Sequence, residues 1–401
     1  MKNKGNSKKA HKKIDVTNLT RSYRTKVREG LPPSELVISL EKELDLRYGE
    51  NPNQPGSVYR LKGASITEFI NIHVVKEGKE GLSATNFMDI VRALDILKFF
   101  DAPSVAIMKH NIPCGFATQL KRSLTEIYKL ARDCDPTSAY GSVVVLNRPL
   151  DVLTAEEITK TFVECVAAPG FEDGAIEILG RKKDIRAVCY SNLDKLPKFV
   201  GDNVEGLYDI KILPTGRAIV QKPYLSRIRG PEDLVLKPLV KRLDKRTGVE
   251  KEYSVKRAPT PAELRDLLTA WYVNIGVRSN GIVFVKNGVT VAISSGQSER
   301  VGAVRDAITK AYQKAMDREG IPYDPLEGAS ARNKLSANPL EGAVVSSDGF
   351  FPFRDSIDLM ARVGVTAIIQ PGGSKNDHEI IEAVNEHKMA MVYTLERCFR
   401  H

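Results

Sequence analysis

The sequence predicts an α/β fold in which a similar arrangement of strands and helices occurs in each half of the chain. Three observations support this: short apolar runs between polar residues, a well-marked helix that opens the second half, and a strand, a Pro/Gly-bearing turn and a helix in both halves. A chain of 401 residues is long enough for two domains with full cores. We expect these domains to span residues 25–205 and 206–401, after a tail of residues 1–24.

Two buried strands are predicted in the first half. Ser104–Met108 (SVAIM) and Ser142–Leu146 (SVVVL) are short apolar runs of the kind found in buried strands. Helical spacing of apolar residues predicts a helix over Thr154–Val166. Between Asn192 and Pro259 the chain is rich in Lys, Arg, Pro and Gly, which indicates a connector with edge strands.

The second half opens with a helix whose start is marked by three residues. Thr260 is an N-cap, Pro261 suits the first helical position, and Glu263 completes a capping box. The runs Gly281–Val285 and Val289–Ile293 then flank a Lys-Asn-Gly segment. Asn and Gly tolerate the positive φ of a tight turn, so these runs predict a β-hairpin.

A strand, a turn and a helix are predicted near the carboxyl end. Thr366–Ile369 is apolar, the turn is Gln370–Ser374 (QPGGS), and the helix runs from about residue 376 to 386. The first-half segment Lys109–Gly115 (KHNIPCG) is the expected counterpart of the QPGGS turn. Gly372-Gly373-Ser374 could bind an anion through free backbone N–H groups, although such segments are mostly plain turns. A P-loop motif is absent.

The net charge of +10 is concentrated at the amino end. Residues 1–13 contain six lysines and no acidic residue. This composition predicts a disordered, solvated tail; a nucleic-acid-binding arm is the alternative, but it lacks neighbouring aromatic residues. The rest of the chain is mildly basic, which suits an enzyme that handles anionic metabolites.

Cysteine usage and hydropathy narrow the class of protein further. Five scattered cysteines without a C-x-x-C pair indicate reduced thiols, with neither a disulfide framework nor a structural zinc. There is no secretory signal and no apolar run of the roughly 20 residues that span a bilayer. We therefore expect a cytoplasmic protein with no membrane segment.

The pair Lys109-His110 follows directly after a predicted buried strand. Reactive groups in α/β proteins often lie at such strand ends. Histidine exchanges protons near neutral pH, because its ordinary pKa is about 6.5, and a lysine can hold an anionic substrate. The alternative is a strand end with two solvated polar residues, and spacing alone slightly favours that alternative.

Longer motifs decide between a catalytic Lys-His pair and a solvated strand end. In chain order they are RYGENPNQ (47–54), the KHNIPCG segment, DPTSAYG (135–141), RSNGIV (278–283), GQSER (296–300), SSDGFFPFRD (346–355) and RCFRH (397–401). Together they resemble the AICAR transformylase family, over nearly all of the chain beyond the first 45 or so residues.

The resemblance implies a fold of two tandem cytidine-deaminase-like domains and a homodimer with active sites at its interface. It implies formyl transfer from 10-formyltetrahydrofolate, the co-substrate, to the exocyclic amine of AICAR, giving formyl-AICAR and tetrahydrofolate in purine synthesis. It implies no catalytic metal and leaves open a structural monovalent cation.

Residue roles follow from the same resemblance. Lys109 and His110 match the catalytic pair, with His110 as the base. The positions that match the AICAR site are Arg47, Tyr48, Asn86, Gly141, Glu164, Asn280, Phe350, Arg397 and His401, of which Arg47 and Arg397 would hold the phosphate. The positions that match the folate site are Arg300, Pro352, Phe353, Asp355 and Ser374.

The chain departs from the family pattern at several positions. Glu164 replaces a shorter Asp, Tyr140 replaces a common Phe, and Glu299 stands where an uncharged residue is usual. Only 46 residues precede Arg47, too few for the IMP cyclohydrolase domain. We therefore expect a stand-alone transformylase, with cyclohydrolase activity supplied by a separate protein.

Three alternative functions fit the sequence less well. A zinc deaminase needs H-x-E or C-x-E together with P-C-x-x-C, and these motifs are absent. A basic RNA-binding protein would carry its charge over a folded face, whereas much of the excess here lies in the tail, so no specific nucleic-acid partner is expected. A catalytically silent nucleotide-binding relative is disfavoured by the complete Lys-His and Arg positions.

Overall fold

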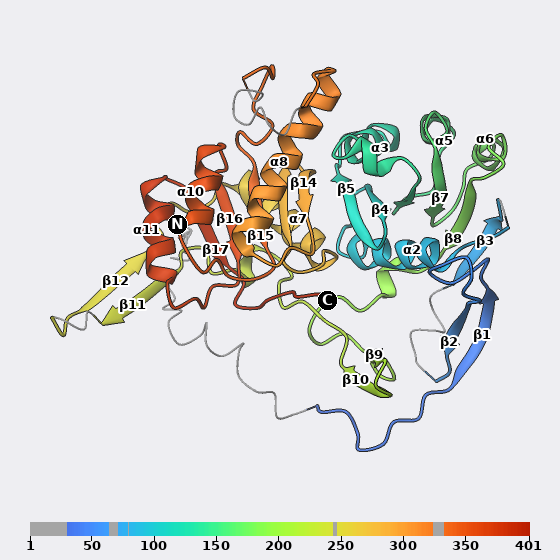
Figure 1. The fold of residues 1–401 in the computed structure, drawn as a ribbon, viewed down its shortest axis with the longest axis horizontal. Coiled ribbons are helices and arrows are strands. Elements are labelled where there is room, and N and C mark those ends of the chain that lie inside the picture. Colours follow the sequence, from blue (N-terminus) through green and yellow to red (C-terminus); the bar gives the residue numbers. More distant parts are fainter. Residues whose placement is uncertain (1–29, 64–70, 79, 244–246, 324–332) are drawn as a thin grey trace, which may run out of the picture.

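A computed structural model of the protein describes residues 30–63, 71–78, 80–243, 247–323 and 333–401. The predicted tail, residues 1–24, lies outside the described residues. The fold is α/β and is built on a mixed sheet of eleven strands that extends through both halves of the chain (Figure 1). The predicted boundary at residue 205 stays a prediction, since both halves contribute to this one sheet.

The strand order in the large sheet is β17-β16-β15-β13-β14-β5-β4-β6-β7-β8-β3. Strands β6, β7 and β8 are mutually parallel, as are β15, β16 and β17, and all other neighbours are antiparallel. The strands are β3 (Ile72–Lys76), β4 (Ser104–Lys109), β5 (Ile112–Thr118), β6 (Ser142–Leu146), β7 (Val163–Ala168), β8 (Arg186–Tyr190), β13 (Ile282–Lys286), β14 (Val289–Ser294), β15 (Val344–Ser347), β16 (Ala367–Gln370) and β17 (Ala390–Tyr393).

Helices cover both faces of the sheet (Figure 1). They are α2 (Ala84–Leu97), α3 (Leu124–Arg132), α4 (Pro136–Ala139), α5 (Val152–Ile158), α6 (Ala175–Gly180), α7 (Pro261–Ile275), α8 (Arg300–Glu319), α10 (Asp355–Arg362) and α11 (Asp377–Glu386). In the described part of the chain, none of the helices combines the length and apolar character that crossing a membrane requires.

Three small antiparallel hairpins stand outside the large sheet. They pair β1 (Leu40–Asp45) with β2 (Ser57–Leu61), β9 (Asp209–Leu213) with β10 (Arg217–Gln221), and β11 (Leu239–Leu243) with β12 (Glu250–Ser254). The connector expected between residues 192 and 259 therefore contains strands, but these form separate hairpins and are not edge strands of the large sheet.

The order of elements is the same in the two halves. A helix, a β-hairpin, a helix and three parallel strands with intervening helices occur first from α2 to β8 and again from α7 to β17. The first part of each repeat aligns without gaps at an offset of 177 residues. Both α2 and α7 begin with a capping box, formed by Ser83 and Asn86 in one and by Thr260 and Glu263 in the other.

The hairpin turns align at the same offset. His110 and Asn111 connect β4 to β5, with φ of 54° and 65°, and Asn287 and Gly288 connect β13 to β14, with φ of 53° and 73°. Two successive positive φ values are those of a type I′ turn, whose twist matches the flanking strands. The hairpin predicted from the Asn-Gly pair is thus confirmed, and Lys109-His110 lies at the corresponding turn.

Two sequence-based expectations are wrong in detail. The helix expected over Thr154–Val166 ends at Ile158, and Val163 opens strand β7. The segment KHNIPCG is a hairpin turn followed by strand β5, so it is not the counterpart of QPGGS. The β-branched and apolar residues of β7 fit a helix and a buried strand equally well by periodicity, and burial between β6 and β8 decides for the strand.

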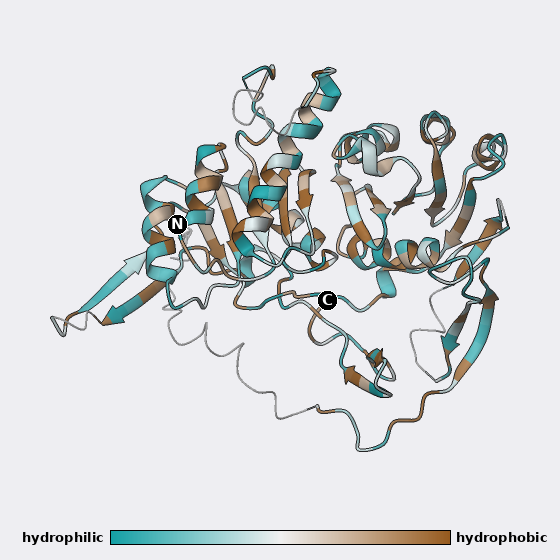
Figure 2. Cartoon of the chain, in the orientation of Figure 1, coloured by the Kyte–Doolittle hydropathy of each residue, from teal (hydrophilic) through white to brown (hydrophobic). Residues whose placement is uncertain are grey.

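The core is divided by the sheet into three clusters. On one face, α2 and α7 pack into a single cluster that runs beneath both repeats and includes the fully buried Trp271. On the other face, α3, α5 and α6 cover the first repeat and α8, α10 and α11 cover the second. The strands are accordingly apolar on both sides, as a sheet between two helical layers requires (Figure 2).

The closest backbone approach in the first repeat is made by Gly115 in β5. A Cβ at this position would lie 1.9 Å from the carbonyl oxygen of Ala131 in α3. We expect Gly115→Ala to lower the free energy of unfolding by about 3 kcal/mol, because backbone must move to admit the methyl group. Chemical denaturation measures this. Gly180→Ala is the control, since a Cβ there meets no atom within 4 Å, and equal stability of both variants would contradict the prediction.

Candidate functional site

All the predicted site residues lie at or next to one edge of the large sheet. Strand β4 ends at this edge with Lys109, and β6 and β7 begin there because they run antiparallel to β4. The antiparallel contact of β14 with β5 and the pairing of β13 with β15 bring the carboxyl ends of β15, β16 and β17 to the same edge. The turn Asn287-Gly288 lies at the opposite edge, beside Thr118 at the end of β5.

One group of site residues belongs to the first repeat. We call it the first group: Arg47, Tyr48, Asn86, Lys109, His110, Gly141 and Glu164. Asn86 is buried in the first turn of α2 and donates its side-chain amide to Glu164 Oε2 at 2.9 Å. Lys109 Nζ donates to the carbonyl oxygens of Gly141 at 2.5 Å and Tyr140 at 3.2 Å. Helix α2 and strands β4, β6 and β7 thus converge around the Lys109 ammonium.

Arg47 and Tyr48 join this group through the backbone. The Arg47 N–H donates to the Leu82 carbonyl at 2.8 Å, and the Tyr48 carbonyl accepts from the Ala84 N–H at 3.0 Å. The chain at residues 47–48 is therefore attached to the start of α2. The Arg47 guanidinium pairs with Glu80 at 3.0 Å and lies 5.2 Å from the centre of the Tyr48 ring.

Gly141 is required for the conformation and for the space around Lys109. Its φ is 67°, and a Cβ there would lie 3.1 Å from Lys109 Nζ and 3.3 Å from the Phe162 ring. A side chain at this position would thus be strained and would displace the ammonium. His110 is exposed at the turn, so its imidazole is open to a ligand.

The remaining site residues belong to the second repeat. We call them the second group: Asn280, Arg300, Phe350, Pro352, Phe353, Asp355, Ser374, Arg397 and His401. The carboxyl-terminal segment lies across the others, because the Ser279 N–H donates to the Arg400 carbonyl at 2.9 Å and the Cys398 N–H to the Asp348 carbonyl at 3.2 Å. The Arg397 guanidinium lies 4.6 Å from the centre of the Phe399 ring.

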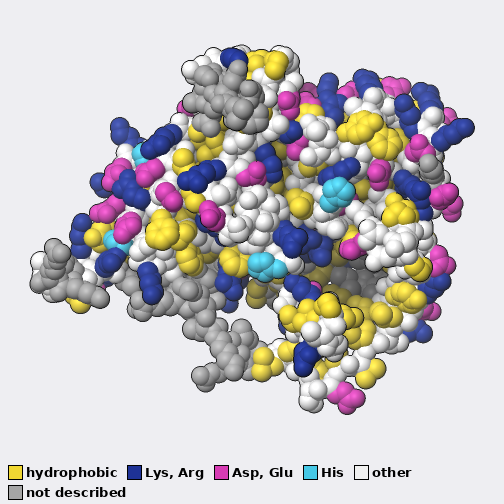
Figure 3. All heavy atoms as spheres, in the orientation of Figure 1, with side chains coloured by type: hydrophobic (Ala, Val, Ile, Leu, Met, Phe, Trp, Pro, Cys, Tyr) yellow, Lys and Arg dark blue, Asp and Glu magenta, His cyan; other side chains and the backbone are white. Residues whose placement is uncertain are grey.

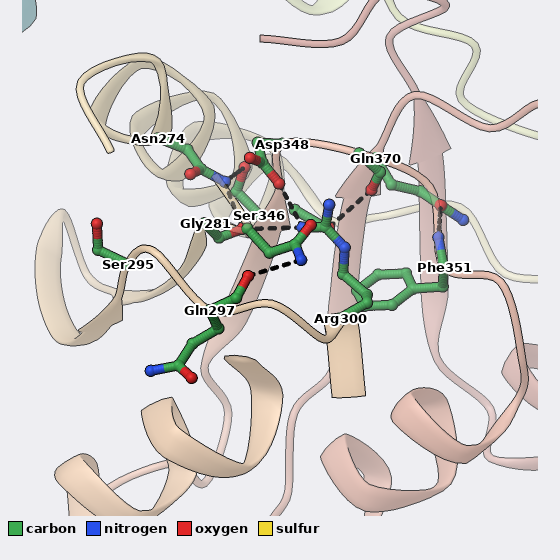
Figure 4. A network of polar contacts seen from close by, with 12 residues as sticks. Asn274, Gly281, Ser295, Gln297, Arg300, Ser346, Asp348, Phe351 and Gln370 are labelled. Carbon is green, nitrogen blue, oxygen red and sulfur yellow. Dashed lines mark hydrogen bonds and ion pairs between the residues drawn. The ribbon is translucent and has the colours of Figure 1, made fainter. Parts of the chain in front are cut away.

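Arg300 is held in a network of polar contacts that includes Gly281 and Asp348 (Figure 4). It is 9% exposed, and its guanidinium pairs with the fully buried carboxylate of Asp348 and reaches the Gly281 carbonyl at 3.4 Å. The Asn280 side-chain amide donates to the Gln297 carbonyl at 2.8 Å. Arg300 is thus tied to the protein interior, and Asn280 to the loop that precedes α8.

The expected folate positions are partly linked to one another. The Asn376 side-chain amide donates to the Pro352 carbonyl at 2.9 Å, and the Ser374 hydroxyl accepts from the Asn376 N–H at 3.1 Å. Phe353 is 59% exposed, and Asp355 begins helix α10. The turn after β16 and the loop before α10 therefore form one surface with an exposed aromatic ring.

Of the two interpretations of Gly372-Gly373-Ser374, an anion site or a plain turn, the structure favours the plain turn. The N–H groups of Gly373 and Ser374 donate to the carboxylate of Asp377, at 2.8 and 3.1 Å. Asp377 is 3% exposed, and burial raises its pKa to about 7 although the two N–H donors favour the charged form. A buried carboxylate thus fills the position that an anionic ligand would take.

Two cavities adjoin the site residues. The larger, of about 790 Å³, lies between α2, the β1–β2 and β9–β10 hairpins and the carboxyl-terminal segment, with several cationic side chains in its wall: Arg60, Arg92, Lys98, Lys211, Arg397 and Arg400. Figure 3 shows this face of the molecule hollowed beside the β9–β10 hairpin, with Lys and Arg side chains nearby. The smaller, of about 250 Å³, is lined by Lys109 and His110 from the first repeat and by Ser295, Lys310 and Lys314 from the second.

Metal ligands are not grouped in the described ranges, where no cluster of three or more His, Cys, Asp or Glu side chains could hold an ion. One buried carboxylate oxygen, Asp348 Oδ2, has no hydrogen-bond partner among these residues.

The chain is similar to a known protein family over most of its length. The family model described as AICARFT/IMPCHase bienzyme matches residues 6–310. The chain is 38% identical over 369 residues to the bifunctional purine biosynthesis protein PurH of Anaeromyxobacter sp. (strain Fw109-5), covering 92% of this chain and 62% of that protein. Against the proteins of the same name from Magnetococcus marinus and Persephonella marina the identities are 36% and 37%, over 96% and 92% of this chain and 65% and 61% of theirs.

The chain therefore belongs to the AICARFT/IMPCHase bienzyme family. It spans a little under two thirds of the length of these relatives.

Sequence reasoning missed the carboxylates that support the site. Asp89 in α2 accepts the Asn111 N–H at 2.6 Å, and Asp377 holds the turn after β16. The signal for Asp89 was available: it stands six residues after the N-cap Ser83, as Asp266 does after Thr260. The signal for Asp377 was weaker, because an Asp in the first turn of a helix is common.

We predict that the contribution of Asp377 to stability depends on pH. Its pKa is about 7 when folded and about 4 when unfolded, so the folded chain takes up a proton first as the pH falls from 8 to 5. The stabilisation is present at low pH and lost as the pH rises through about 7. The difference in unfolding free energy between wild type and Asp377→Asn should therefore be about 1–3 kcal/mol larger at pH 5 than at pH 8.

Denaturant titrations at the two pH values measure this difference. Asp194→Asn, at a carboxylate that is 75% exposed, is the control and should show no such change. A pH-independent difference for Asp377→Asn would refute the assignment.

Proposed function

We propose that the protein transfers a formyl group from 10-formyltetrahydrofolate to the 5-amino group of AICAR, producing formyl-AICAR and tetrahydrofolate. The observation that carries the proposal is the Lys109-His110 turn, gathered with Asn86, Gly141 and Glu164 at one sheet edge in a chain of this family. His110, which is exposed, and Lys109, which is partly buried, line the same cavity, where a base and a cation could act on one substrate.

His110 and Lys109 have different proposed roles in the transfer of the formyl group. The amine of AICAR is a weak nucleophile because its lone pair is delocalised into the ring and the carboxamide. His110 would remove the proton as the C–N bond forms. Lys109 would stabilise negative charge on the tetrahedral intermediate or the departing folate nitrogen. Two of its three donors are used by Tyr140 and Gly141, which fixes the direction of the third.

The substrates are proposed to bind along the same edge. Arg47 and Arg397 would hold the phosphate, and Tyr48, Asn86, Gly141, Glu164, Asn280, Phe350 and His401 would surround the ribose and the heterocycle. The exposed ring of Phe353 and the carboxylate of Asp355 suit a pterin, with Pro352, Ser374 and Arg300 beside them. The pair of Arg300 with Asp348 would have to open if its guanidinium is to contact folate.

The wider assembly belongs to the same proposal. The repeated order of elements supports two tandem cytidine-deaminase-like domains. With Phe350 set aside, no hydrogen bond or ion pair joins the site residues of one group to those of the other in the part of the chain that the structure describes. A homodimer in which each active site takes one group from each chain would unite them. If the fold needs a monovalent cation, Asp348 Oδ2 is a buried oxygen that would suit it.

Replacing the proposed base tests the reaction. In an assay with AICAR and 10-formyltetrahydrofolate that follows tetrahydrofolate release and identifies the purine product, His110→Ala should lower kcat by about 10²–10⁴-fold. Alanine tolerates a positive φ less well than histidine, so the matched control is Asn287→Ala, which changes the corresponding turn at the other edge. This control should keep its activity.

The outcomes separate the candidate functions. Wild-type protein that binds AICAR without turnover would indicate a silent relative or another formyl donor, and protein that does not bind AICAR would refute the proposal. If deletion of residues 1–20 abolished retention of RNA while AICAR stayed unbound, a basic RNA-binding protein would be the better description.

The shared site is tested by complementation. His110→Ala and Arg397→Ala should each be inactive, whereas their co-expression should restore up to about a quarter of wild-type activity. Random pairing makes half of the dimers mixed, and each mixed dimer contains one site with both residues intact. A mixture no more active than its components would place the two residues in a site formed by one chain.

A further inference from the structure

The two hairpin turns are held by the same device. In the first repeat, Asp89 Oδ1 accepts the Asn111 N–H at 2.6 Å. In the second, the two oxygens of Asp266 accept the N–H groups of Asn287 and Gly288, each at 2.7 Å. Asp89 and Asp266 occupy the same position in α2 and α7, 177 residues apart. A carboxylate on the helix thus braces the turn of the following hairpin twice in one chain.

Only the turn of the first repeat contains a residue of the proposed catalytic pair. The turn braced by Asp266 lies at the edge of the sheet away from the site, beside Thr118 and Gln119, and contains Asn and Gly. The turn braced by Asp89 lies at the site edge and contains His110, with Lys109 directly before it. The second repeat therefore shows what the brace does for the fold alone, and any further effect at Asp89 belongs to the site.

The turn at the site has a greater need for the brace. His110 and Asn111 both have positive φ without being glycine, a conformation that costs an L-residue some free energy, whereas the second turn has Gly288 at its second position. The Asp89 carboxylate is 3% exposed, so water does not replace its bond to Asn111. A charge-assisted hydrogen bond in such a place is stronger than a neutral one.

We propose that Asp89 is a positioning residue for formyl transfer, whose buried carboxylate holds the β4–β5 turn so that Lys109 and His110 face the substrates in the reactive arrangement. This inference rests on the proposed function of the Lys-His pair. In this role Asp89 needs no contact with a substrate; it acts through the Asn111 N–H and through the interaction of its charge with the Lys109 ammonium.

The positioning effect of Asp89 on formyl transfer should depend on pH, because it depends on the charge of the carboxylate. Burial raises the pKa of Asp89 to about 6, while the Asn111 N–H and Lys109 oppose this rise. The carboxylate is therefore charged at pH 7.5 and loses its charge below about pH 6. The titratable groups that face it come from β4, β5 and β7: Lys109, Cys114, Glu164 and Cys165, and His110 contributes its backbone N–H.

Two pairs of variants separate positioning from general stability. Asp89→Asn and Asp266→Asn keep an oxygen acceptor and remove the charge, and Asp89→Ala and Asp266→Ala remove both. All four should lower the melting temperature, and the Asp89 variants should lower it by at least as much as the Asp266 variants, because the first turn has no glycine at its positive-φ positions. The two Asp89 variants should lower kcat by about 10- to 100-fold with little change in KM for AICAR, because misplaced reacting groups slow the chemical step more than binding. The Asp266 variants should keep kcat within about twofold.

The pH profile of kcat is the second measurement. Between pH 7.5 and 5.5, part of the fall in wild-type kcat should result from protonation of Asp89. This part should be absent in Asp89→Asn, whereas Asp266→Asn should follow the wild-type profile. An Asp89→Asn variant with wild-type kcat and profile would overturn the proposal. So would an Asp266→Asn variant that loses kcat equally.

Amide hydrogen exchange tests the brace without reference to activity. Asp89→Asn should speed exchange at the Asn111 amide and leave the Gly288 amide unchanged, and Asp266→Asn should do the reverse. If the wild type fails to transfer formyl groups but exchange follows this pattern, the proposed function fails and the brace stands. If exchange at Asn111 is unchanged in Asp89→Asn, the brace itself is refuted.

Discussion

The contact between β5 and β14 joins the two repeats into one sheet, and the position of the second group of site residues relative to the first depends on it. The backbones pair at Ala117 and Val289, and next to this pair the Thr290 hydroxyl accepts the Phe116 N–H at 2.8 Å and donates to the Phe116 carbonyl at 3.0 Å. The contact is antiparallel, so the second repeat is inverted relative to the first. The Lys109-His110 turn of one repeat therefore shares an edge with the carboxyl ends of the parallel strands of the other.

The helices beneath the sheet make this arrangement rigid. Helices α2 and α7 share one core cluster, and they approach so closely that a Cβ on Gly276 would lie 2.6 Å from the Ile96 side chain. Both helices also brace the hairpins above them through Asp89 and Asp266. The same pair of helices thus holds the two repeats together, aligns the sheet and supports the turn that carries the proposed base.

Much of the fold could be predicted because its signals are local. The capping box of α7, the hairpin after it and the strands at 104, 142 and 367 follow from caps, turn residues and apolar runs. The helix expected to continue to Val166 failed because periodicity cannot separate a buried strand from a buried helix. The true counterpart of KHN is the Asn287 turn, which a comparison of Pro/Gly content overlooked and a comparison of spacing finds.

The candidate site could likewise be predicted only in part. The sequence by itself determined the residue types, the Lys-His pair, the family motifs and, through the 177-residue spacing, a carboxylate before each hairpin. Only the tertiary structure decided that Asp377 occupies the N–H groups of Gly373 and Ser374, that Arg300 pairs with the buried Asp348, and that two groups separated in sequence by the stretch from Glu164 to Asn280 share an edge. Caps and turns depend on neighbours within a few residues, whereas burial, ion pairing and strand order depend on which distant segments meet, and that depends on packing the whole chain.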